Sequence, residues 1–340
     1  MLVKVFMLTA GHNYEQTLLR SMKEGIEKQL IPDSEIEIHK LKQINKIVNL
    51  GLGVNYDYNE KYTKCDVAVM LGSWKPLRGS MHHQVRTDIK NNAKCFICIE
   101  TPILNRTLEF EKCNYFRVGV NGFVNKDAYF GPNIKHPDDR LLKLGNLKFS
   151  EWHNQLGNKI VIAMQLTGDA SLRGTDINEW CFDTINTLKM YTNRPIEIRM
   201  HPAASSKGME AYNPVLQKIV YSKNDYSNVT FVDGKTISLR NQLSDAYCLV
   251  SYSSGTAIDA LCMGIPNITC DEGSFAWNVS ETKLENIENL LLLKKSAINQ
   301  HLSNLAYCQW SQDEMSSGLV WNHLVSGIKN YLQNGNDQWE

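Results

Sequence analysis

Polar groups that can hold an anion follow three strand-like runs in the second half of the chain. "TGDASLRG" follows Leu166, "HPAASS" follows Met200 and "SYSSGT" follows Val250. Carboxyl ends of parallel strands meet at one edge of a sheet, so we expect these groups to lie together. The residues expected to bind the anion are Thr167, Gly168, Ser171, Arg173, Arg199, His201, Ser253, Ser254, Gly255 and Thr256.

The stretch "VSYSSGTAIDALCMGIP", residues 250–266, shows this chemistry most fully. The first turn of a helix leaves backbone N–H groups unpaired and carries the positive end of the helix dipole, which suits a phosphate. Gly255 would let the backbone approach the ligand closely. An ordinary N-cap made by serine or threonine is the alternative interpretation. Arg199 and His201 share one face of a strand and, with Arg173, would supply positive charge.

Several common nucleotide-binding patterns are absent. The sequence has no GxxxxGK[ST] loop, no GxGxxG after the first strand of either half, and no D-x-D pair for Mg²⁺. We therefore predict that no metal and no cofactor are used. Cationic side chains and a helix end would take the charge of a leaving group instead.

Strand-like and helix-like stretches alternate along the whole chain, which predicts an α/β architecture with parallel sheets. The predicted strands are 3–8, 35–41, 65–71, 94–99, 159–166, 195–200, 228–233, 246–252 and 267–270. The predicted helices are 14–30, 80–92, 177–190 and a helical tail over 297–333, in which "SQDE" at 311–314 is a capping box.

The region 131–157 is rich in Gly, Pro and charge, and we expect the domain boundary there. The predicted domains cover 1–150 and 151–310, and a C-terminal helical segment over 311–340 follows them. Two such domains commonly enclose a cleft between them.

Composition limits the class of protein. The 340 residues include 36 basic and 36 acidic side chains, so the whole molecule is no polycation. No apolar segment approaches the roughly 20 residues that span a bilayer, and the alternation in "MLVKVFML" favours a first strand over a signal peptide. Nine cysteines lie mostly in apolar runs and read as reduced thiols. We expect a cytoplasmic protein with no membrane partner.

"RMHP" followed by "VSYSSGTAIDALCMGIP" resembles the His-Pro and Ser-Ser motifs of GT-B glycosyltransferases that handle sialic acid, Kdo or glycerol phosphate. The resemblance covers roughly residues 159–275. It implies two Rossmann-like domains facing a cleft, an acceptor-binding one over 1–150 and a donor-binding one over 151–310, with a C-terminal helix over 311–340 crossing back to the first domain. It also implies that His201 and the serine turn hold the phosphate of a nucleotide sugar.

Four blocks resemble proteins encoded by tailed phages: "QLTGDASLRG", "TNRPIEIRMHP", "DEGSFAW" and "LAYCQWSQDEMSSGLVW". Phages with hypermodified DNA use GT-B enzymes to glycosylate hydroxymethylated pyrimidines. The resemblance therefore implies a UDP-linked sugar as donor and double-stranded DNA with hydroxymethylated bases as acceptor, in the cytoplasm of the phage's host. The neutral net charge departs from a simple DNA-binding protein.

One basic stretch, 74–94, offers an acceptor face. Side chains four apart would form a stripe on a helix that could follow a phosphate backbone, with a tryptophan to stack on a base. A solvated helix face is the alternative. The predicted acceptor-binding residues are Trp74, Lys75, Arg78, His82, Arg86 and Lys90, with Lys94 continuing the stripe.

Sugar transfer with inversion needs a base near the acceptor hydroxyl. His12, Glu100 and Asp169 follow predicted strands and are the candidates, whereas a retaining enzyme would need none. Asp259 could bond the ribose, and Asp271 opens a loop, "DEGSFAW", that could contact the donor sugar.

Together these features predict a metal-independent hexosyl- or pentosyltransferase that moves a sugar from a nucleotide sugar to a hydroxymethylated cytosine or uracil in phage DNA. Three alternatives remain open. These are a glycosyltransferase or glycerophosphotransferase acting on a surface polysaccharide, a sugar-nucleotide 2-epimerase, and a non-catalytic phage structural protein.

Overall fold

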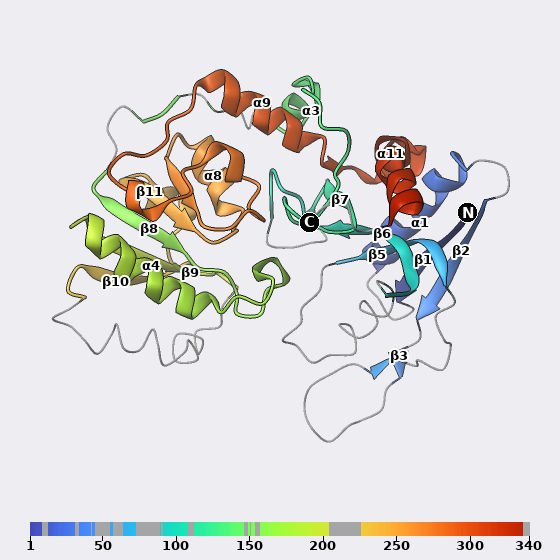
Figure 1. Ribbon diagram of the computed structural model, residues 1–340, viewed down its shortest axis with the longest axis horizontal. Helices are drawn as coiled ribbons and strands as arrows, with labels where there is room; N and C mark the ends of the chain where they lie inside the picture. Colours follow the sequence, from blue (N-terminus) through green and yellow to red (C-terminus); the bar gives the residue numbers. More distant parts are fainter. Residues whose placement is uncertain are drawn as a thin grey trace. The chain divides into compact units, whose positions relative to one another are not determined.

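The chain forms two compact α/β units (Figure 1). Unit 1 comprises Met1–Arg140 and Ser303–Glu340, and unit 2 comprises Leu141–Leu302. The expected ranges 1–150, 151–310 and 311–340 remain predictions. The computed structural model describes residues 1–8, 13–30, 34–41, 43–44, 55–56, 64–72, 89, 91–107, 112–145, 149, 151–153, 157–203 and 226–335.

Unit 1 is built on a six-stranded sheet of order β13-β7-β6-β5-β1-β2. β2, β1, β5 and β6 run parallel to one another. β7 pairs antiparallel with β6, and β13 pairs antiparallel with β7 at the edge of the sheet. β3 and β4 pair antiparallel as a separate two-stranded sheet. The strands are β1 (Leu2–Leu8), β2 (Glu35–Leu41), β3 (Gln43–Ile44), β4 (Asn55–Tyr56), β5 (Cys65–Leu71), β6 (Ala93–Glu100), β7 (Phe116–Val120) and β13 (Gln309–Trp310).

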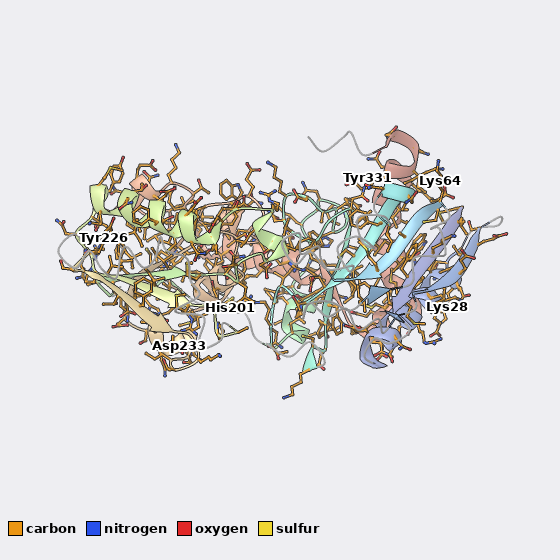
Figure 2. The ribbon with its side chains drawn as sticks, turned by 90° about the horizontal axis from the view of Figure 1, so that it is seen from below. Lys28, Lys64, His201, Tyr226, Asp233 and Tyr331 are labelled. Carbon is orange, nitrogen blue, oxygen red and sulfur yellow. The ribbon has the colours of Figure 1, made fainter. Side chains whose placement is uncertain are left out.

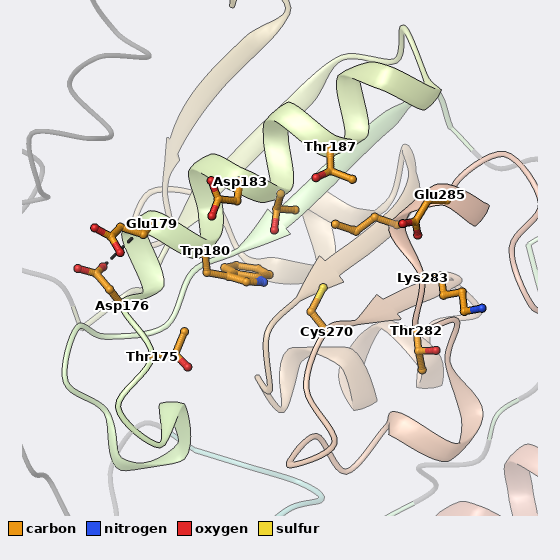
Figure 3. Close-up of a pocket in the computed structure, with 12 residues that line it drawn as sticks. Thr175, Asp176, Glu179, Trp180, Asp183, Thr187, Cys270, Thr282, Lys283 and Glu285 are labelled. Carbon is orange, nitrogen blue, oxygen red and sulfur yellow. Dashed lines mark hydrogen bonds between the residues drawn. The ribbon is translucent and has the colours of Figure 1, made fainter.

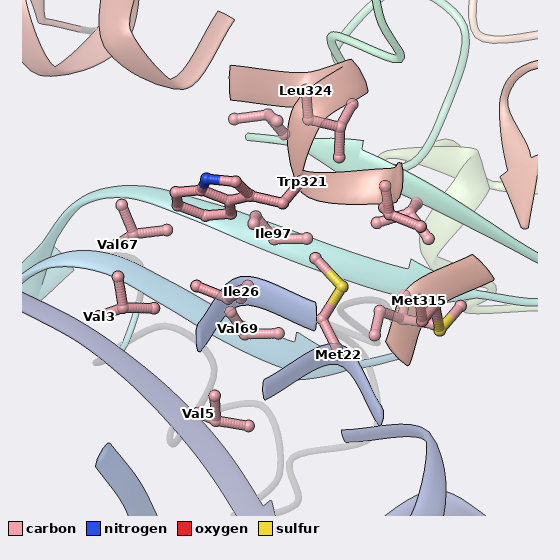
Figure 4. Close-up of a cluster of buried hydrophobic side chains, with 14 of the residues drawn as sticks. Val3, Val5, Met22, Ile26, Val67, Val69, Ile97, Met315, Trp321 and Leu324 are labelled. Atoms are coloured by element: carbon pink, nitrogen blue, oxygen red, sulfur yellow. The ribbon is translucent and has the colours of Figure 1, made fainter. Parts of the chain in front are cut away.

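One face of this sheet carries a large hydrophobic cluster of unit 1. Alternate residues of each strand point to the same face, as Val3 and Val5 do in β1 and Val67 and Val69 do in β5, and all four are fully buried. The helices α1 (Asn13–Glu27), α10 (Gln312–Ser317) and α11 (Leu319–Asn334) supply the opposing side chains, Trp321 among them (Figure 4). The expected return of the C-terminal helix to the first domain is confirmed.

The C-terminal segment is divided into three helices. α9 (Lys295–Ala306) precedes β13, and α10 starts at the predicted capping box, in which Ser311 Oγ accepts from the Glu314 N–H and Glu314 Oε2 accepts from the Ser311 N–H. Gly318, at φ 87°, then ends α10 and begins α11. Only a left-handed residue allows this break, which the apolar period alone did not indicate.

Gly25 in α1 allows α10 to approach closely. A Cβ atom at this position would lie 1.8 Å from the Met315 carbonyl oxygen and 2.9 Å from the Gly318 nitrogen. We expect Gly25→Ala to lower the free energy of unfolding of unit 1 by about 1–3 kcal/mol, the usual cost of overpacking. Urea unfolding measures this change, and Arg20→Ala, an exposed substitution on the same helix, is the control and should match wild type. A stability of Gly25→Ala equal to wild type would show that α10 does not pack here.

Unit 2 contains a five-stranded, all-parallel sheet of order β10-β9-β8-β11-β12. Its strands are β8 (Lys159–Ala163), β9 (Ile196–Met200), β10 (Val229–Asp233), β11 (Ala246–Ser251) and β12 (Asn267–Thr269), so every strand expected in this half is confirmed with small changes at its ends. The remaining elements are η3 (Ala170–Leu172), α4 (Ile177–Tyr191), α7 (Leu239–Leu243), α8 (Thr256–Cys262), η4 (Trp277–Val279), η5 (Leu284–Asn286) and, where unit 1 meets unit 2 in the sequence, α3 (Asp139–Lys143).

Helices cover the sheet of unit 2. α4 presents Ile177, Cys181, Ile185 and Leu188, all fully buried, to a face formed by isoleucines of β8 and β9. This is the apolar stripe that the helical period predicted. Burial also raises the pKa of Cys181 to about 12, so this thiol is an inert part of the core. α8 contacts β11 and β12.

In the part of the chain that the structure describes, no helix has the length and apolar character to cross a membrane.

Candidate functional site

The order of the unit 2 sheet selects one place for a ligand. β8 and β11 are neighbours in the sheet. The chain continues from β8 to β9 on one side, and from β11 to β12 on the other side. Ligands of open parallel sheets bind at such a switch point, outside the carboxyl ends of the strands. The candidate site is therefore formed by the loop 164–176 after β8 and the loop 252–255 after β11, which we call the switch-point loops.

The loop after β8 is shaped by its own polar side chains. Asp169 Oδ1 accepts from the Ser171 N–H at 2.9 Å and from the Ser171 hydroxyl at 2.8 Å, which caps η3. Gly168 at φ 72° and Arg173 at φ 51° take left-handed conformations on either side. Thr167 is exposed at the turn. Asp169, a candidate base, therefore has a structural bond to Ser171 in this loop.

A buried hydrogen-bond network joins the two switch-point loops. Gln165 Oε1 accepts from the Ser253 N–H at 3.0 Å, and Gln165 Nε2 donates to Ser171 Oγ at 2.8 Å. Ser253 Oγ donates to the Ser171 carbonyl at 3.1 Å. Gln165 was missed in the sequence because it falls inside the predicted strand 159–166. Ser171 and Ser253 are brought together as expected, and their hydroxyls also fix the loops to each other.

The start of α8 is capped locally. Ser254 Oγ accepts from the Thr256 N–H at 3.3 Å and from the Thr256 hydroxyl at 2.9 Å. Gly255 has φ −63°, an ordinary helical value, so its backbone needs no glycine for conformational reasons. Asp259 lies in the first turn of the helix and is half-buried.

Arg173 brings positive charge to this edge. Its Nη2 donates to Asp271 Oδ2 at 2.6 Å, and Asp271 Oδ1 accepts from the Gly273 N–H at 2.8 Å. This ion pair joins the loop after β8 to the loop after β12. Both loops were expected at this edge because they follow parallel strands of one sheet. Arg173 keeps about a third of its side chain exposed, at 30%, so an anion in solvent can reach it.

His201 and Arg199 have different surroundings, although Arg199 lies in β9 and His201 directly follows that strand. His201 lies just beyond the carboxyl end of β9, and Figure 2 labels it together with Asp233 at the end of β10. Its Nδ1 accepts from the Ala203 N–H at 3.1 Å, so any further contact falls to Nε2.

The structure does not bring Arg199 to the edge with the other candidates. Its guanidinium is buried and donates to the Ile237 and Gly234 carbonyls and to Gln242 Oε1, at 2.7–3.1 Å. Burial lowers the pKa of Arg199. The expectation that Arg199 binds the donor is corrected for this physical reason: its donors hold the segment 234–242 against β9.

The candidates of unit 1 are only partly described. Glu100 is the last residue of β6, and its Oε1 accepts from the Thr101 N–H at 2.9 Å, so the side chain caps the turn that follows. Lys94 pairs with Asp66 at 2.7 Å, which raises the pKa of Lys94. The candidates outside the described residues are His12, Trp74, Lys75, Arg78, His82, Arg86 and Lys90.

Among the residues that the structure describes, no three His, Cys, Asp or Glu side chains gather in a way that could hold a metal ion.

Comparison with known proteins gives structural similarity only. The chain matches no protein-family model and no curated protein sequence. Among solved structures it is similar to the β-Kdo 2,7 transferase KpsC of Thermosulfurimonas dismutans, with 13% identity, a TM-score of 0.49 and coverage of 95% of this chain and 99% of that one.

Two further structures show lower similarity. One is the UDP-GlcNAc 2-epimerase of Methanocaldococcus jannaschii in complex with UDP-GlcNAc and UDP, with 14% identity, a TM-score of 0.31 and coverage of 96% and 100%. The other is the heptosyltransferase WaaC of E. coli with an ADP-heptose analogue, with 8% identity, a TM-score of 0.24 and coverage of 79% and 88%. Similarity at such low sequence identity says nothing of the reaction that this chain catalyses.

Proposed function

We propose that the chain is a glycosyltransferase and that the switch-point loops of unit 2 bind the nucleotide part of its sugar donor. One observation carries the proposal: both loops at the switch point of a parallel sheet are tied into one network by Gln165, with Arg173 exposed beside it. A diphosphate needs hydroxyl and N–H donors together with a nearby cation, and these loops supply both.

The charge of the leaving group sets the chemistry of the site. Breaking the bond between sugar and diphosphate leaves negative charge on the diphosphate, which a fixed guanidinium can stabilise. Arg173 is the residue we assign to that role, and the hydroxyls of Ser254 and Thr256, with His201, would bond the phosphate oxygens. Asp271 would release one guanidinium donor to the ligand. We keep the proposal that no metal is required, and undiminished turnover in EDTA would support it.

Removing the Arg173 guanidinium should weaken nucleotide binding without unfolding the protein. We expect Arg173→Ala to raise the Kd for UDP by about 10–100-fold, because a hydrogen bond to a charged group contributes roughly 1.5–3 kcal/mol. Thermal-shift titration measures it, since a bound ligand raises apparent stability. Arg240→Ala, an exposed arginine of α7 in the same unit, is the matched control and should bind UDP like wild type. Equal Kd values for Arg173→Ala and wild type would reject the assignment.

For the acceptor we propose the hydroxyl of a hydroxymethylated base in double-stranded DNA. The basic stretch 74–94 is the only feature that supports this acceptor. Reversing Arg86, Lys90 and Lys94 to glutamate should abolish retention of such DNA at low salt and remove about three units of the salt slope. A filter-binding titration against salt measures this. Unchanged retention would reject this acceptor face.

The main alternatives differ in what they consume. A surface-polysaccharide transferase releases the nucleotide only with a saccharide acceptor, whereas a 2-epimerase converts the nucleotide sugar with no acceptor at all. Proton NMR of UDP-GlcNAc incubated with the protein, alone and then with each acceptor, separates these outcomes.

A further inference from the structure

The guanidinium that we assign to the diphosphate of the donor is already paired with a carboxylate of the protein. Asp271 Oδ2 accepts from Arg173 Nη2 at 2.6 Å, and the two side chains are only partly exposed, at 30% for Arg173 and 11% for Asp271. Carboxylates and phosphates compete for one guanidinium, because both present charged oxygen acceptors. A diphosphate that takes over this donor must therefore displace Asp271.

The backbone on both sides of Arg173 is fixed by hydrogen bonds. The Arg173 N–H donates to the Ala170 carbonyl at 3.2 Å, and the Thr175 N–H donates to the Leu172 carbonyl at 2.9 Å. A shift of this loop would break these bonds, whereas a partly exposed side chain changes its rotamer freely. The exchange of partners therefore falls to the side chain of Arg173 and not to the loop that carries it.

Tyr252 contacts both sides of this ion pair. Its hydroxyl is bonded to Thr175 Oγ1 at 2.8 Å, and its carbonyl accepts from the Asp271 N–H at 3.1 Å. Figure 3 shows Thr175 in the loop that leads into α4 and the Trp180 ring one turn into that helix. The Trp180 ring meets the Tyr252 ring edge-on, with centroids 5.8 Å apart. Tyr252 is therefore held in place between the loop after β8 and the loop after β12.

The Tyr252 hydroxyl also lies beside the Asp271 carboxylate. Burial raises the pKa of Tyr252 and the charge of Asp271 raises it further, whereas the bond from Thr175 opposes the change. A phenol has one proton to donate, so with Thr175 as its donor that proton is available to Asp271. The Gly273 N–H donates to Asp271 Oδ1 at 2.8 Å. Asp271 thus keeps two donors when Arg173 turns to another anion.

We propose that Asp271 is an internal competitor for the anion site. Its carboxylate holds the Arg173 guanidinium until the diphosphate of the donor displaces it, and Tyr252 is a positioning residue that, with Gly273, then retains the carboxylate. This inference rests on the proposed function and adds a means of regulation to the same site. Because Asp271 returns to Arg173 as the nucleotide leaves, the exchange favours release of the product.

Titrations of the whole protein with UDP and with inorganic pyrophosphate test the competition. Asp271→Asn keeps the shape of the side chain but removes its charge, so we expect the Kd for both ligands to fall by about three- to fivefold, as for a partly exposed ion pair. This gain should vanish in an Arg173→Ala background, which has no guanidinium to compete for. Glu272→Gln removes a charge from an exposed acid of the same loop and should leave the Kd close to that of wild type.

Tyr252→Phe should change the affinity in the opposite direction. Without the phenol hydroxyl the Asp271 carboxylate depends more on Arg173, so we expect the Kd for UDP to rise by about threefold. This loss should disappear when Asp271→Asn is also present, because the two residues act through one contact. Tyr226→Phe is the matched control, since it removes a hydroxyl that donates to Asn186 Oδ1 at 2.9 Å elsewhere in unit 2.

Two results would overturn the proposal. One is binding of UDP and pyrophosphate to Asp271→Asn with wild-type or lower affinity, since removing a competitor must raise the affinity. The other is a loss in Tyr252→Phe that persists in the Asp271→Asn background, which would indicate a structural role. UDP binding that Arg173→Ala does not weaken would reject the nucleotide site itself. Weaker binding in Arg173→Ala without a gain in Asp271→Asn would reject only the competition.

Discussion

Arg140→Ala is expected to lower the free energy of unfolding of unit 1 by about 3–5 kcal/mol, the cost of breaking a buried ion pair from one side. Arg140 donates to both carboxylate oxygens of Glu314, at 2.6 and 2.9 Å, and to the Ala306 and Gln309 carbonyls. Its guanidinium also lies 4.2 Å from the centre of the Trp310 ring. Truncation therefore leaves a carboxylate and two carbonyls without their donor.

The pKa of Glu314 reports the same pair. Burial alone would raise it, but the bonds from Arg140 and Ser311 outweigh burial and lower it. Hydrogen exchange of the β6 amides, in the centre of the sheet of unit 1, measures the loss of stability. Lys143→Ala, an exposed change on the same short helix, should leave this exchange unchanged. If Arg140→Ala costs no more than Lys143→Ala, the pair does not hold the C-terminal segment to unit 1.

Unit 1 is also expected to lose about 3 kcal/mol of stability between pH 6.5 and pH 4 through His323. Burial, with smaller contributions from His136 and Arg140, lowers the pKa of His323 from 6.5 to about 4, although its bond to the Phe130 carbonyl opposes the change. The unfolded chain takes up this proton near pH 6.5 and the folded unit does not. The stabilising contribution is therefore complete above pH 6.5 and is lost as the pH falls through about 4.

Urea unfolding across this pH range measures the effect. His323→Gln, which keeps a donor for the Phe130 carbonyl but cannot take up the proton, should flatten a large part of the pH dependence. His153→Gln, at an exposed histidine of unit 2, should leave it unchanged. Parallel pH profiles for wild type and His323→Gln would contradict a buried, neutral His323.

Strands with a clear alternating or continuous apolar pattern could be predicted closely from the sequence, whereas weakly patterned ones could not. The predicted ranges 35–41 and 65–71 coincide with β2 and β5. β7 was missed, because Arg117 and Gly119 interrupt the apolar signal and the strand depends on pairing with β6 and with β13 from the far end of the chain. Pairing over such a distance leaves no local signal.

The candidate site was predictable to the level of strand ends but not of single contacts. Ser171, Arg173, Ser253 and Asp271 do converge, because parallel order alone brings their loops together. The predicted position of Arg199 at the ligand edge was wrong. The alternation of β9 indicates on which face of the strand Arg199 lies, but only the fold shows that Gln242 and the Gly234 carbonyl bind its guanidinium.

Hydrogen–deuterium exchange with UDP, GDP, ADP and CMP in turn tests the central claim most directly. If unit 2 binds the nucleotide of a sugar donor at its switch point, at least one of them slows exchange in the loops 164–176 and 252–255, and this protection is lost in Arg173→Ala. Protection confined to other segments, or none with any of the four, would contradict the account.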